Sequence, residues 1–591
     1  MRPETDGVRH RKKHPMSPFR KMTAEEIAAA ERYGTTAENW SQILVSDDFT
    51  PAQLQQCRLE GRVEIGSGAR IIRSQVGNYR LGVGTLVEGV TSMVCRHRST
   101  FGNGTKVAAM NECGGRTVKI TDNLSAQTAY LAAVYRHRPQ LVAALESMAD
   151  DYAESRAAEL GETGRDCRIV GARFIREVRM GDRVTIDGAS ILQNGTLCDG
   201  VRIGVDVKAY DFIAAEDAAI DNGATLERCF VGECCRLDKG FTAGESLFFA
   251  NSHCENGEAV SIFAGPYTAS HHKSSLLIAG MFSFFNAGSG TNQSNHLYKS
   301  GAVHQSVHLR GCKFASGAYI MSPAAEGAFT MVKGSHSDHH DTSIFPYSYL
   351  IEKEGRSQLM PGANLTSYGT VRDIEKWPAR DRRRANRDVI DFDEYSPYVA
   401  GAMLQAVDRL HTLQDEAPEA EQYIHGNTVI RSTALTRGIK LYDKAIVAAL
   451  GKMLAAGAPD SRYDGSGRWL DVAGQYIAKR EVDAIVEAIE QGRLKRFDEI
   501  DNRFRVFHVH YAAYARSWAE HIYASLLGHA PSNEEIADAI AAGDNAHAAM
   551  RRTTDADLKR DESPDLSVGY GPDCDTDEER QADYRAVRGL K

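Results

Sequence analysis

Ile186-Asp187-Gly188-Ala189 is followed by Val201-Arg202-Ile203-Gly204 and then by Ile220-Asp221-Asn222-Gly223-Ala224. In these segments, aliphatic residues recur at a spacing near six and stand beside glycine or another small turn-forming residue. A coil of three short strands points one aliphatic side chain per side toward its axis, and its corners favour Gly, Asn and Asp because these tolerate positive φ. Stacked coils then bury one another's aliphatic ladders. The pattern predicts a left-handed parallel β-helix from about Arg165 to about Pro346.

The same pattern occurs nearer the N-terminus, where residues 61–71 and Val76-Gly77-Asn78 contain aliphatic residues and glycines at short intervals. The spacing is not strict, so an antiparallel β-domain with Gly-rich turns is the competing interpretation. Aliphatic-Gly pairs recur at 169–171, 203–204 and 231–232 without the alternation of a hairpin. This recurrence favours the solenoid.

Helical periodicity appears in two other parts of the chain. Between residues 123 and 161, apolar residues such as Leu141 and Leu145 have helical spacing, which predicts a helical hairpin or one bent helix on the side of the solenoid. Beyond the charged run at 380–384, the chain again has helical spacing, and residues 504–527 form an aromatic-rich stretch typical of a buried helix.

We therefore expect a mainly β fold with α elements, built as a left-handed parallel β-helix with an inserted helical segment and a helical C-terminal region. The expected parts are an N-terminal arm with helices (1–59), first β-helix coils (60–122), a helical insertion (123–164), the main β-helix with the site (165–376), a helical C-terminal domain (377–552) and a poorly ordered tail (553–591).

Composition narrows the classes of partner. The chain has 591 residues, a formal net charge of −9 and 42% hydrophobic residues, which fits a globular protein of several domains. The net negative charge argues against nucleic acid as the main binding partner. No stretch approaches the roughly 20 apolar residues that a membrane helix needs. We therefore expect neither nucleic acid nor a membrane as a partner.

The 11 cysteines are scattered and include no CxxC pair, so they indicate free thiols rather than a structural zinc knuckle. The basic cluster Arg9 to Lys13 is not followed by the apolar segment of a secretory signal. Both features predict a cytoplasmic protein.

Polar residues with catalytic potential gather in one region. Eight of the 20 histidines fall within residues 271–340, among many Asn, Gln and Ser residues. These side chains offer many donors and acceptors with little bulk, as a site for a polyhydroxylated or carbonyl-bearing ligand requires. Histidine can also act as a general base near neutral pH. The competing interpretation is that Asn and Ser follow the solenoid corners while the histidines occupy exposed faces.

Acyl transfer is the first hypothesis for this region. One histidine, His304 or His296, would deprotonate a hydroxyl or amine of a sugar or nucleotide-sugar, which then attacks a thioester such as acetyl-CoA or another acyl-CoA. The expected substrate-binding residues are His271, His272, Asn286, Asn292, Gln293, Asn295 and His308.

Two other hypotheses remain open. In a zinc hydrolase or lyase, His336, His339 and His340 would bind the metal, although adjacent histidines in an extended strand point in opposite directions. In the third, the protein binds a sugar or nucleotide without chemistry, or acts as a scaffold. If His296, His304 and His336 converge on one pocket, an enzyme is favoured, and if they lie on separate faces, binding or scaffolding is favoured.

The aliphatic-Gly runs at 61–78, 169–204 and 220–237 resemble those of the hexapeptide-repeat superfamily, which includes sugar acyltransferases and γ-type carbonic anhydrases. The whole chain resembles a family of large bacterial proteins of unknown function, common in Bacteroidetes and often labelled hexapeptide transferases. The segments that carry this resemblance are Met22-Thr23-Ala24-Glu25-Glu26-Ile27, Ala37-Glu38-Asn39-Trp40, Gly290-Thr291-Asn292-Gln293-Ser294-Asn295-His296, Gly334-Ser335-His336, Pro346-Tyr347-Ser348-Tyr349-Leu350 and Trp469-Leu470-Asp471-Val472-Ala473-Gly474.

The superfamily resemblance implies a left-handed β-helix, sites between coils of neighbouring subunits and a homo-oligomer, commonly a trimer. It also implies acyl-CoA as a cosubstrate or, as in the γ-type carbonic anhydrases, zinc. The chain differs from an ordinary acyltransferase in its length, its irregular repeats, its inserted helix and its large helical C-terminal region.

Overall fold

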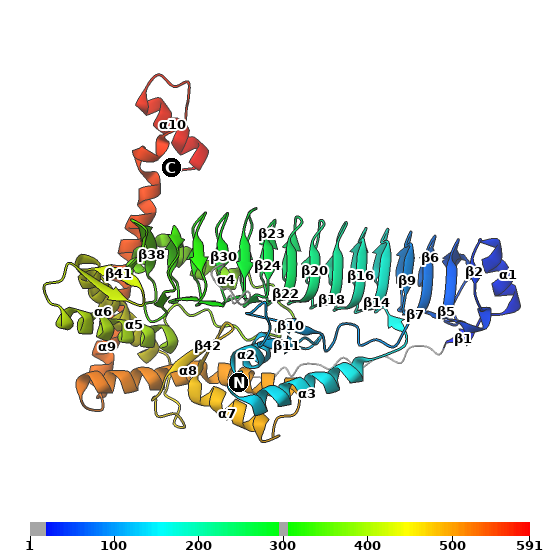
Figure 1. Ribbon diagram of the computed structural model, residues 1–591, viewed down its shortest axis with the longest axis horizontal. Coiled ribbons are helices and arrows are strands. Elements are labelled where there is room, and N and C mark those ends of the chain that lie inside the picture. The colour runs from blue at the N-terminus through cyan, green and yellow to red at the C-terminus, as the bar shows by residue number, and fades with distance from the viewer. Residues whose placement is uncertain (1–18, 295–304, 591) are drawn as a thin grey trace.

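The centre of the molecule is a long β-solenoid, seen in a computed structural model that describes residues 19–294 and 305–590 (Figure 1). Its coils stack along one axis from β2 (Thr36–Ala37) and β5 (Arg58–Ile65) to β38 (Tyr349–Lys353). Strands of neighbouring coils pair in parallel along this stack. The expected stack of coils is therefore confirmed.

One ladder of short strands shows the repeat length. Ile169 pairs with Ile186, and Ile186 pairs with Ile203, so one coil takes 17 residues in this region. Each strand places at least one buried residue in the interior, such as Ile169, Ile186 and Ile203. The strands of this ladder are β8 (Leu86–Glu88), β13 (Arg168–Val170), β15 (Thr185–Asp187), β17 (Arg202–Ile203), β19 (Ala219–Ile220), β21 (Arg236–Asp238), β23 (His253–Glu255), β26 (Ala269–Ser270), β29 (Asn286–Ala287), β32 (Lys313–Phe314), β35 (Met331–Lys333) and β38.

A second ladder contains longer strands that bend in the middle. The strands are β14 (Phe174–Met180), β16 (Ile191–Leu197), β18 (Lys208–Ala214), β20 (Thr225–Val231) and β22 (Thr242–Phe248). Their central residues have φ near +50°, namely Glu177, Asn194, Asp211, Arg228 and Glu245. Each bend divides one strand into two sides of the coil, which makes the coil three-sided.

The corners explain why the sequence repeat looks irregular. Glu177, Arg228 and Glu245 occupy the left-handed region, which costs an L-residue roughly 1–2 kcal/mol. Parallel pairing with the coils on both sides holds the strands that flank each corner, so a corner does not require Gly, Asn or Asp. The expected preference for these three residue types therefore holds at only some corners.

Residues 95–160 leave the solenoid and return to it. Val87 of β8 pairs directly with Ile169 of β13, so the stack continues across the gap. The excursion contains a hairpin, β10 (Lys106–Ala108) and β11 (Thr117–Lys119), and two helices, α2 (Ala126–Val134) and α3 (Pro139–Arg156). Alanines of α2 pack against outward-facing apolar side chains of successive coils, including Ile213, Phe230 and Phe263. Small side chains allow this close approach.

The C-terminal region is helical and lies against the last coils, with α7 and α8 below the solenoid and α5, α6 and α9 at its end (Figure 1). A hairpin of β42 (Trp469–Val472) and β43 (Gln475–Ala478) joins this layer. The helices of this region are α4 (Tyr368–Ala379), α5 (Pro397–Glu416), α6 (Ser432–Leu454), α7 (Lys479–Glu490), α8 (Phe497–Leu527), α9 (Asn533–Leu558) and α10 (Asp577–Arg588). The N-terminal helix is α1 (Ala24–Arg32).

Capping residues mark two of the terminal helices. Thr23 forms a capping box with Glu26 at the start of α1. At the other end, Thr576 and Glu579 form the same box at the start of α10, which projects from the body in Figure 1. The composition of residues 553–591 predicts poor order. The described residues of this segment include the helix α10. Its capping box is a sequence signal for a helix start that overall composition does not reveal.

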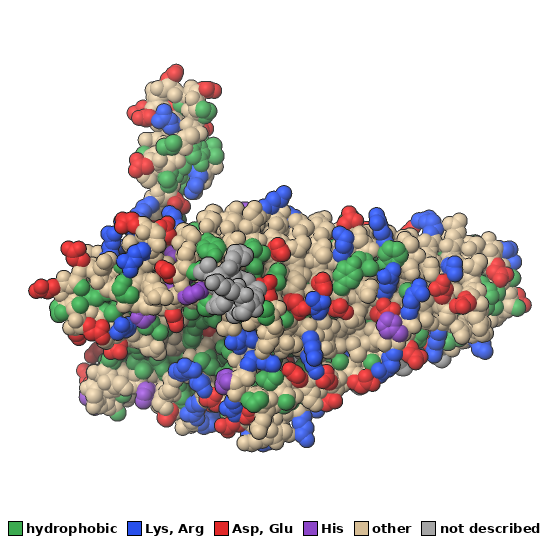
Figure 2. Space-filling model, viewed as in Figure 1, with side chains coloured by type: hydrophobic (Ala, Val, Ile, Leu, Met, Phe, Trp, Pro, Cys, Tyr) green, Lys and Arg blue, Asp and Glu red, His purple; other side chains and the backbone are tan. Residues whose placement is uncertain are grey.

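Surface features add two observations. Within residues 19–294 and 305–590, no helix combines the length and hydropathy needed to cross a membrane. On the face shown in Figure 2, acidic and basic side chains alternate over the solenoid and the helices without a large patch of one sign.

Arg310 joins the solenoid to the C-terminal layer. Its side chain is 1% exposed, and its Nε donates to Asp471 of β42 at 2.8 Å. The other guanidinium nitrogens donate to the carbonyl oxygens of Asp391 at 2.7 Å and Gly474 at 2.5 Å. The guanidinium also lies over the rings of Phe284 and Tyr476, at 4.2 and 4.0 Å from their centroids.

Replacing Arg310 with methionine should destabilise this junction, because Asp471 is left buried without its cation. The expected loss in the free energy of unfolding is about 3–5 kcal/mol, measured by urea denaturation. Arg437→Met, at an exposed position of α6, serves as the control. Equal midpoints for Arg310→Met and the wild type would show that the junction does not depend on this ion pair.

Candidate functional site

The interior of the last coils changes from aliphatic to polar. The strands concerned are β30 (Asn292–Ser294), β31 (Ser306–His308), β34 (Ala324–Glu326), β36 (Ser335–His336) and β37 (Asp341–Thr342). Their inward side chains include Gln293, Ser306, His308, Glu326 and His336, and each of these residues is at most 1% exposed. Parallel register places His308 beside Glu326 of the next coil.

Glu326 is the centre of this network. Its carboxylate accepts one hydrogen bond from Nδ1 of His308 and another from Nε2 of His340 at 2.7 Å. Burial alone would raise the pKa of Glu326, but the two histidines outweigh it and lower the pKa to about 2. His340 also faces the Asp338 carbonyl at 3.2 Å with Nδ1. Burial opposes its charge, yet the bond to Glu326 raises the pKa of His340, which indicates a buried ion pair.

His336 lies next to this pair and behaves in the opposite way. Its Nδ1 accepts from the Ser357 hydroxyl at 2.8 Å, and its Nε2 donates to the Lys333 carbonyl at 3.3 Å. Burial, followed by the nearby His340, lowers the pKa of His336 to about 4. His336 is therefore a neutral, fully hydrogen-bonded core residue near pH 7.

Some polar atoms of this interior have no partner among the described residues. They include Nε2 of His308 and both amide atoms of Gln293. The His308 ring lies among Phe282, Phe285 and Phe314. A cavity of about 30 Å³ adjoins the His308 strand, which is space for little more than a water molecule. This network therefore differs from an open active site.

The other residues expected to bind substrate do not join it. His271 lies at a corner of the solenoid beside His253, and His272 is exposed. Asn286 and Asn292 are partly exposed in β29 and β30. His296, His304 and Asn295 lie outside the described residues. The described members of the expected site are thus distributed between the interior and separate surfaces.

The histidines expected for zinc do not form a common site. His336 and His340 have ring centroids 5.8 Å apart, but three of their four ring nitrogens face oxygen atoms of Lys333, Asp338 and Glu326, and the fourth accepts from Ser357. His339 is exposed and donates from Nδ1 to the Pro323 carbonyl at 3.2 Å. The arrangement fits a hydrogen-bonded core rather than three ligands around one ion.

A larger concave site lies where the solenoid meets the helical layer, and we call it the junction cleft. Its volume is about 420 Å³, within the range of small-molecule sites. The solenoid contributes Leu309, Ala328, Ser343 and Ile344. The helical layer contributes Pro397, Tyr398, Gly401, Ala402, Leu404 and Gln405 from α5, Gly467, Arg468, Trp469 and Leu470 at β42, and Trp518 and Ile522 from α8.

Four side chains of the junction cleft have free hydrogen-bond donors. The guanidinium of Arg468, the hydroxyl of Tyr398, the indole N–H of Trp518 and the amide of Gln405 form no hydrogen bond or ion pair with another described residue. Trp518 is held against α5, where a Cβ placed on Gly401 would be 3.6 Å from its ring. An apolar cleft with several free donors suits a ligand that carries acceptors or negative charge.

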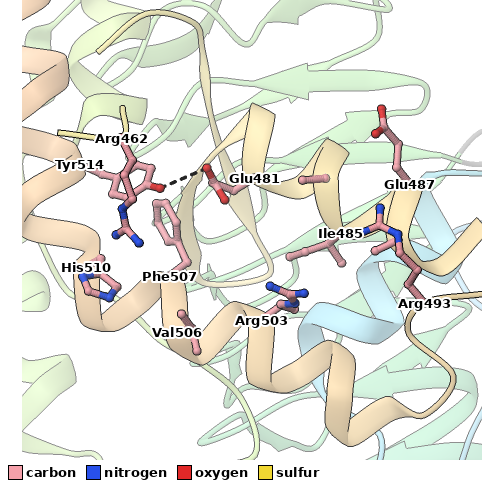
Figure 3. A pocket seen from close by; sticks show the side chains of 12 residues that line it. Arg462, Glu481, Ile485, Glu487, Arg493, Arg503, Val506, Phe507, His510 and Tyr514 are labelled. Carbon is pink, nitrogen blue, oxygen red and sulfur yellow. Dashed lines mark hydrogen bonds between the residues drawn. The ribbon is translucent and has the colours of Figure 1, made fainter. Parts of the chain in front are cut away.

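A second cavity, of about 290 Å³, lies between α7 and α8 (Figure 3). Arg462, Arg493 and Arg503 line it, together with the acidic residues Glu481 and Glu487. The Tyr514 hydroxyl donates to Glu481 at 3.2 Å. The charges are mixed and most of the lining side chains are exposed, so this groove is a weaker candidate than the junction cleft.

The sequence alone predicted neither the junction cleft nor Glu326 as the partner of His308. Glu326 follows His308 by 18 residues, close to the length of one coil, and this spacing is a signal for stacking in register. Nothing comparable indicates the cleft, because its walls are far apart in sequence and meet only when the helices dock.

Acid should destabilise the protein through His336. Its pKa is about 4 in the folded state and ordinarily 6.5, so between these values the unfolded state binds more protons. The free energy of unfolding should fall by about 3 kcal/mol as pH drops from 6.5 to 4. His336→Gln should reduce this fall, whereas His339→Gln, at an exposed position, should retain it. Identical pH profiles for His336→Gln and the wild type in urea denaturation would contradict the assignment.

Comparison with known proteins gives a family but no activity. A family described as a domain of unknown function, DUF4954, matches residues 69–414, and a second such family, DUF6819, matches residues 452–590. A protein of Treponema pallidum (strain Nichols), named "Uncharacterized protein", is 22% identical over 470 residues. That match covers 70% of this chain and 64% of the relative, so the chain spans less than two thirds of the relative's length. Because the first match covers more than half of the sequence, the chain belongs to the DUF4954 family.

Proposed function

We propose that this protein binds a sugar nucleotide in the junction cleft, on a left-handed parallel β-helix of the hexapeptide-repeat type. The helix assignment is supported by parallel pairing, three-sided coils and a coil length of 17 residues, close to three hexapeptides. The observation that carries the ligand assignment is the set of free donors within an aromatic cleft.

The chemistry of the cleft matches the parts of a sugar nucleotide. Trp518 and Tyr398 offer aromatic surface and N–H or O–H donors that suit a base or sugar ring. Arg468, exposed and without an ion-pair partner among the described residues, suits the negatively charged phosphates. Gln405 adds amide groups for sugar hydroxyls.

Binding accounts for this site better than catalysis does. The described residues that line it include no histidine, carboxylate, cysteine or lysine, so they offer no general base or covalent nucleophile other than hydroxyl groups. The described histidines of the 271–340 region are instead divided between the interior and separate surfaces. We further propose a homo-oligomer in the cytoplasm, where the 11 free thiols remain reduced.

Isothermal titration of the full chain with UDP-N-acetylglucosamine should show binding. Arg468→Ala should weaken the affinity about ten- to hundredfold, because a charge-assisted hydrogen bond contributes roughly 1.5–3 kcal/mol. Ala402→Trp, at a partly exposed position of α5, should fill the cleft and abolish binding. Arg437→Ala should bind like the wild type. Binding unchanged in both cleft variants would place the ligand elsewhere, and no binding of this or other sugar nucleotides would contradict the function.

Acyl transfer is the second candidate, and the observation that favours it is His308, whose Nδ1 donates to Glu326 and whose Nε2 has no partner within residues 19–294 and 305–590. With acetyl-CoA and UDP-N-acetylglucosamine, an enzyme of this type would form free CoA and an acetylated sugar nucleotide, detected together by mass spectrometry. His308→Gln should lose at least about a hundredfold in rate, while Arg437→Ala, at an exposed position of α6, retains it. Wild-type protein that forms no acetylated product from this pair would contradict the hypothesis for these substrates.

A further inference from the structure

The strands β21, β23 and β26 bring chemically distinctive side chains onto one outer edge of the solenoid. His253 pairs with Arg236 of the preceding coil and with Ala269 of the following coil. Cys254 pairs with Ser270, so His271, the next residue along, continues the register beside Glu255. His253 and Glu255 are two residues apart and therefore share the outward side of β23.

The three side chains form a compact group. One ligand atom from each of His253, Glu255 and His271 lies within 4.8 Å of the others, and this is the only such group of His, Cys, Asp and Glu among residues 19–294 and 305–590. Nε2 of His253 is 2.8 Å from Oε1 of Glu255. The two imidazole rings meet edge to face, with centroids 4.5 Å apart.

The protonation states suit metal binding. Burial lowers the pKa of both His253 and His271, which keeps their rings neutral near pH 7. Burial would raise the pKa of Glu255, but hydrogen bonds from Lys239 and His253 outweigh it and keep the carboxylate ionised. Two neutral imidazoles and one carboxylate are ligands of Zn²⁺ and related ions.

Neighbouring side chains orient the carboxylate. Nζ of Lys239 lies 2.5 Å from Oε2 of Glu255, which leaves Oε1 directed toward His253. Such outer contacts commonly fix a metal-binding carboxylate. The backbone oxygen of His271 accepts from the Asn256 side chain at 3.1 Å, which helps to hold this corner in place.

A simple hydrogen-bond network would explain only part of this arrangement. Glu255 accepts a hydrogen bond from Nε2 of His253, but neither ring nitrogen of His271 has a hydrogen-bond partner among the described residues. A half-buried imidazole directed at a histidine–glutamate pair, without its own partner, has the geometry expected of a third ligand.

We propose that His253, Glu255 and His271 bind one divalent transition-metal ion, such as Zn²⁺ or Co²⁺. Three protein ligands leave at least one coordination position for water or another ligand. This site shares no residue with the junction cleft, so it stands independently of the proposed sugar-nucleotide binding.

Metal-stripped full-length protein titrated with Co²⁺ tests this directly, because bound Co²⁺ gives visible absorption bands that added Zn²⁺ should displace. We expect one ion per chain for the wild type and for His272→Gln, whose exposed side chain lies outside the group. His271→Gln and His253→Gln should each weaken binding about a hundredfold or more.

Thermal unfolding with and without Zn²⁺ gives a second measurement that detects folding failure in a variant. Zn²⁺ should raise the melting temperature of the wild type and of His272→Gln but not that of His271→Gln. His271 is at a corner and only partly buried, so His271→Gln should fold. The proposal is overturned if the wild type binds no Co²⁺ at micromolar concentration, or if folded His271→Gln binds it equally well.

Discussion

The buried guanidinium of Arg310 is the contact on which the arrangement of the C-terminal half depends. Arg310 directly follows Leu309, which lines the junction cleft. Its guanidinium binds Asp471, which directly follows Leu470, another residue that lines the cleft. This ion pair therefore joins the two segments that contribute Leu309 and Leu470 to the cleft. The backbone oxygens of Asp391 and Gly474 each accept a hydrogen bond from one of the other two guanidinium nitrogens, so every nitrogen of the buried cation has a partner.

The solenoid supplies a rigid support on which these contacts can form. Aliphatic ladders fill the earlier coils, and backbone pairing between coils holds strained corners such as Arg228 in place. In the last coils, the interior becomes a hydrogen-bonded network around Glu326 instead. Such a network is stable only when its charges are paired, which the Glu326–His340 contact provides.

Much of the architecture could be predicted from the sequence, because local patterns encode it. The aliphatic spacing around Ile186 and Ile203 indicated stacked coils, and helical spacing indicated α3, α6 and α7. The corners were less predictable, since neighbouring coils impose positive φ on residues such as Glu177.

The candidate site could not be predicted in the same way. Histidines close in sequence, such as His339 and His340, separate because one faces the interior and the other the surface. Conversely, Tyr398, Arg468 and Trp518 meet only because three distant segments dock on the solenoid. Tertiary docking of this kind leaves no periodic signal in the sequence. In contrast, the proposed metal ligand His271 follows His253 and Glu255 by about one coil, and this spacing identifies them as neighbours once the strand register is known.

Hydrogen–deuterium exchange with and without UDP-N-acetylglucosamine tests the central claim, that the ligand binds between the solenoid and the helical layer. Binding in the junction cleft should slow exchange in residues 397–405, 467–472 and 517–522 together and leave exchange around residues 253–271 unchanged. Protection confined to another part of the chain, or none at saturating ligand, would contradict it.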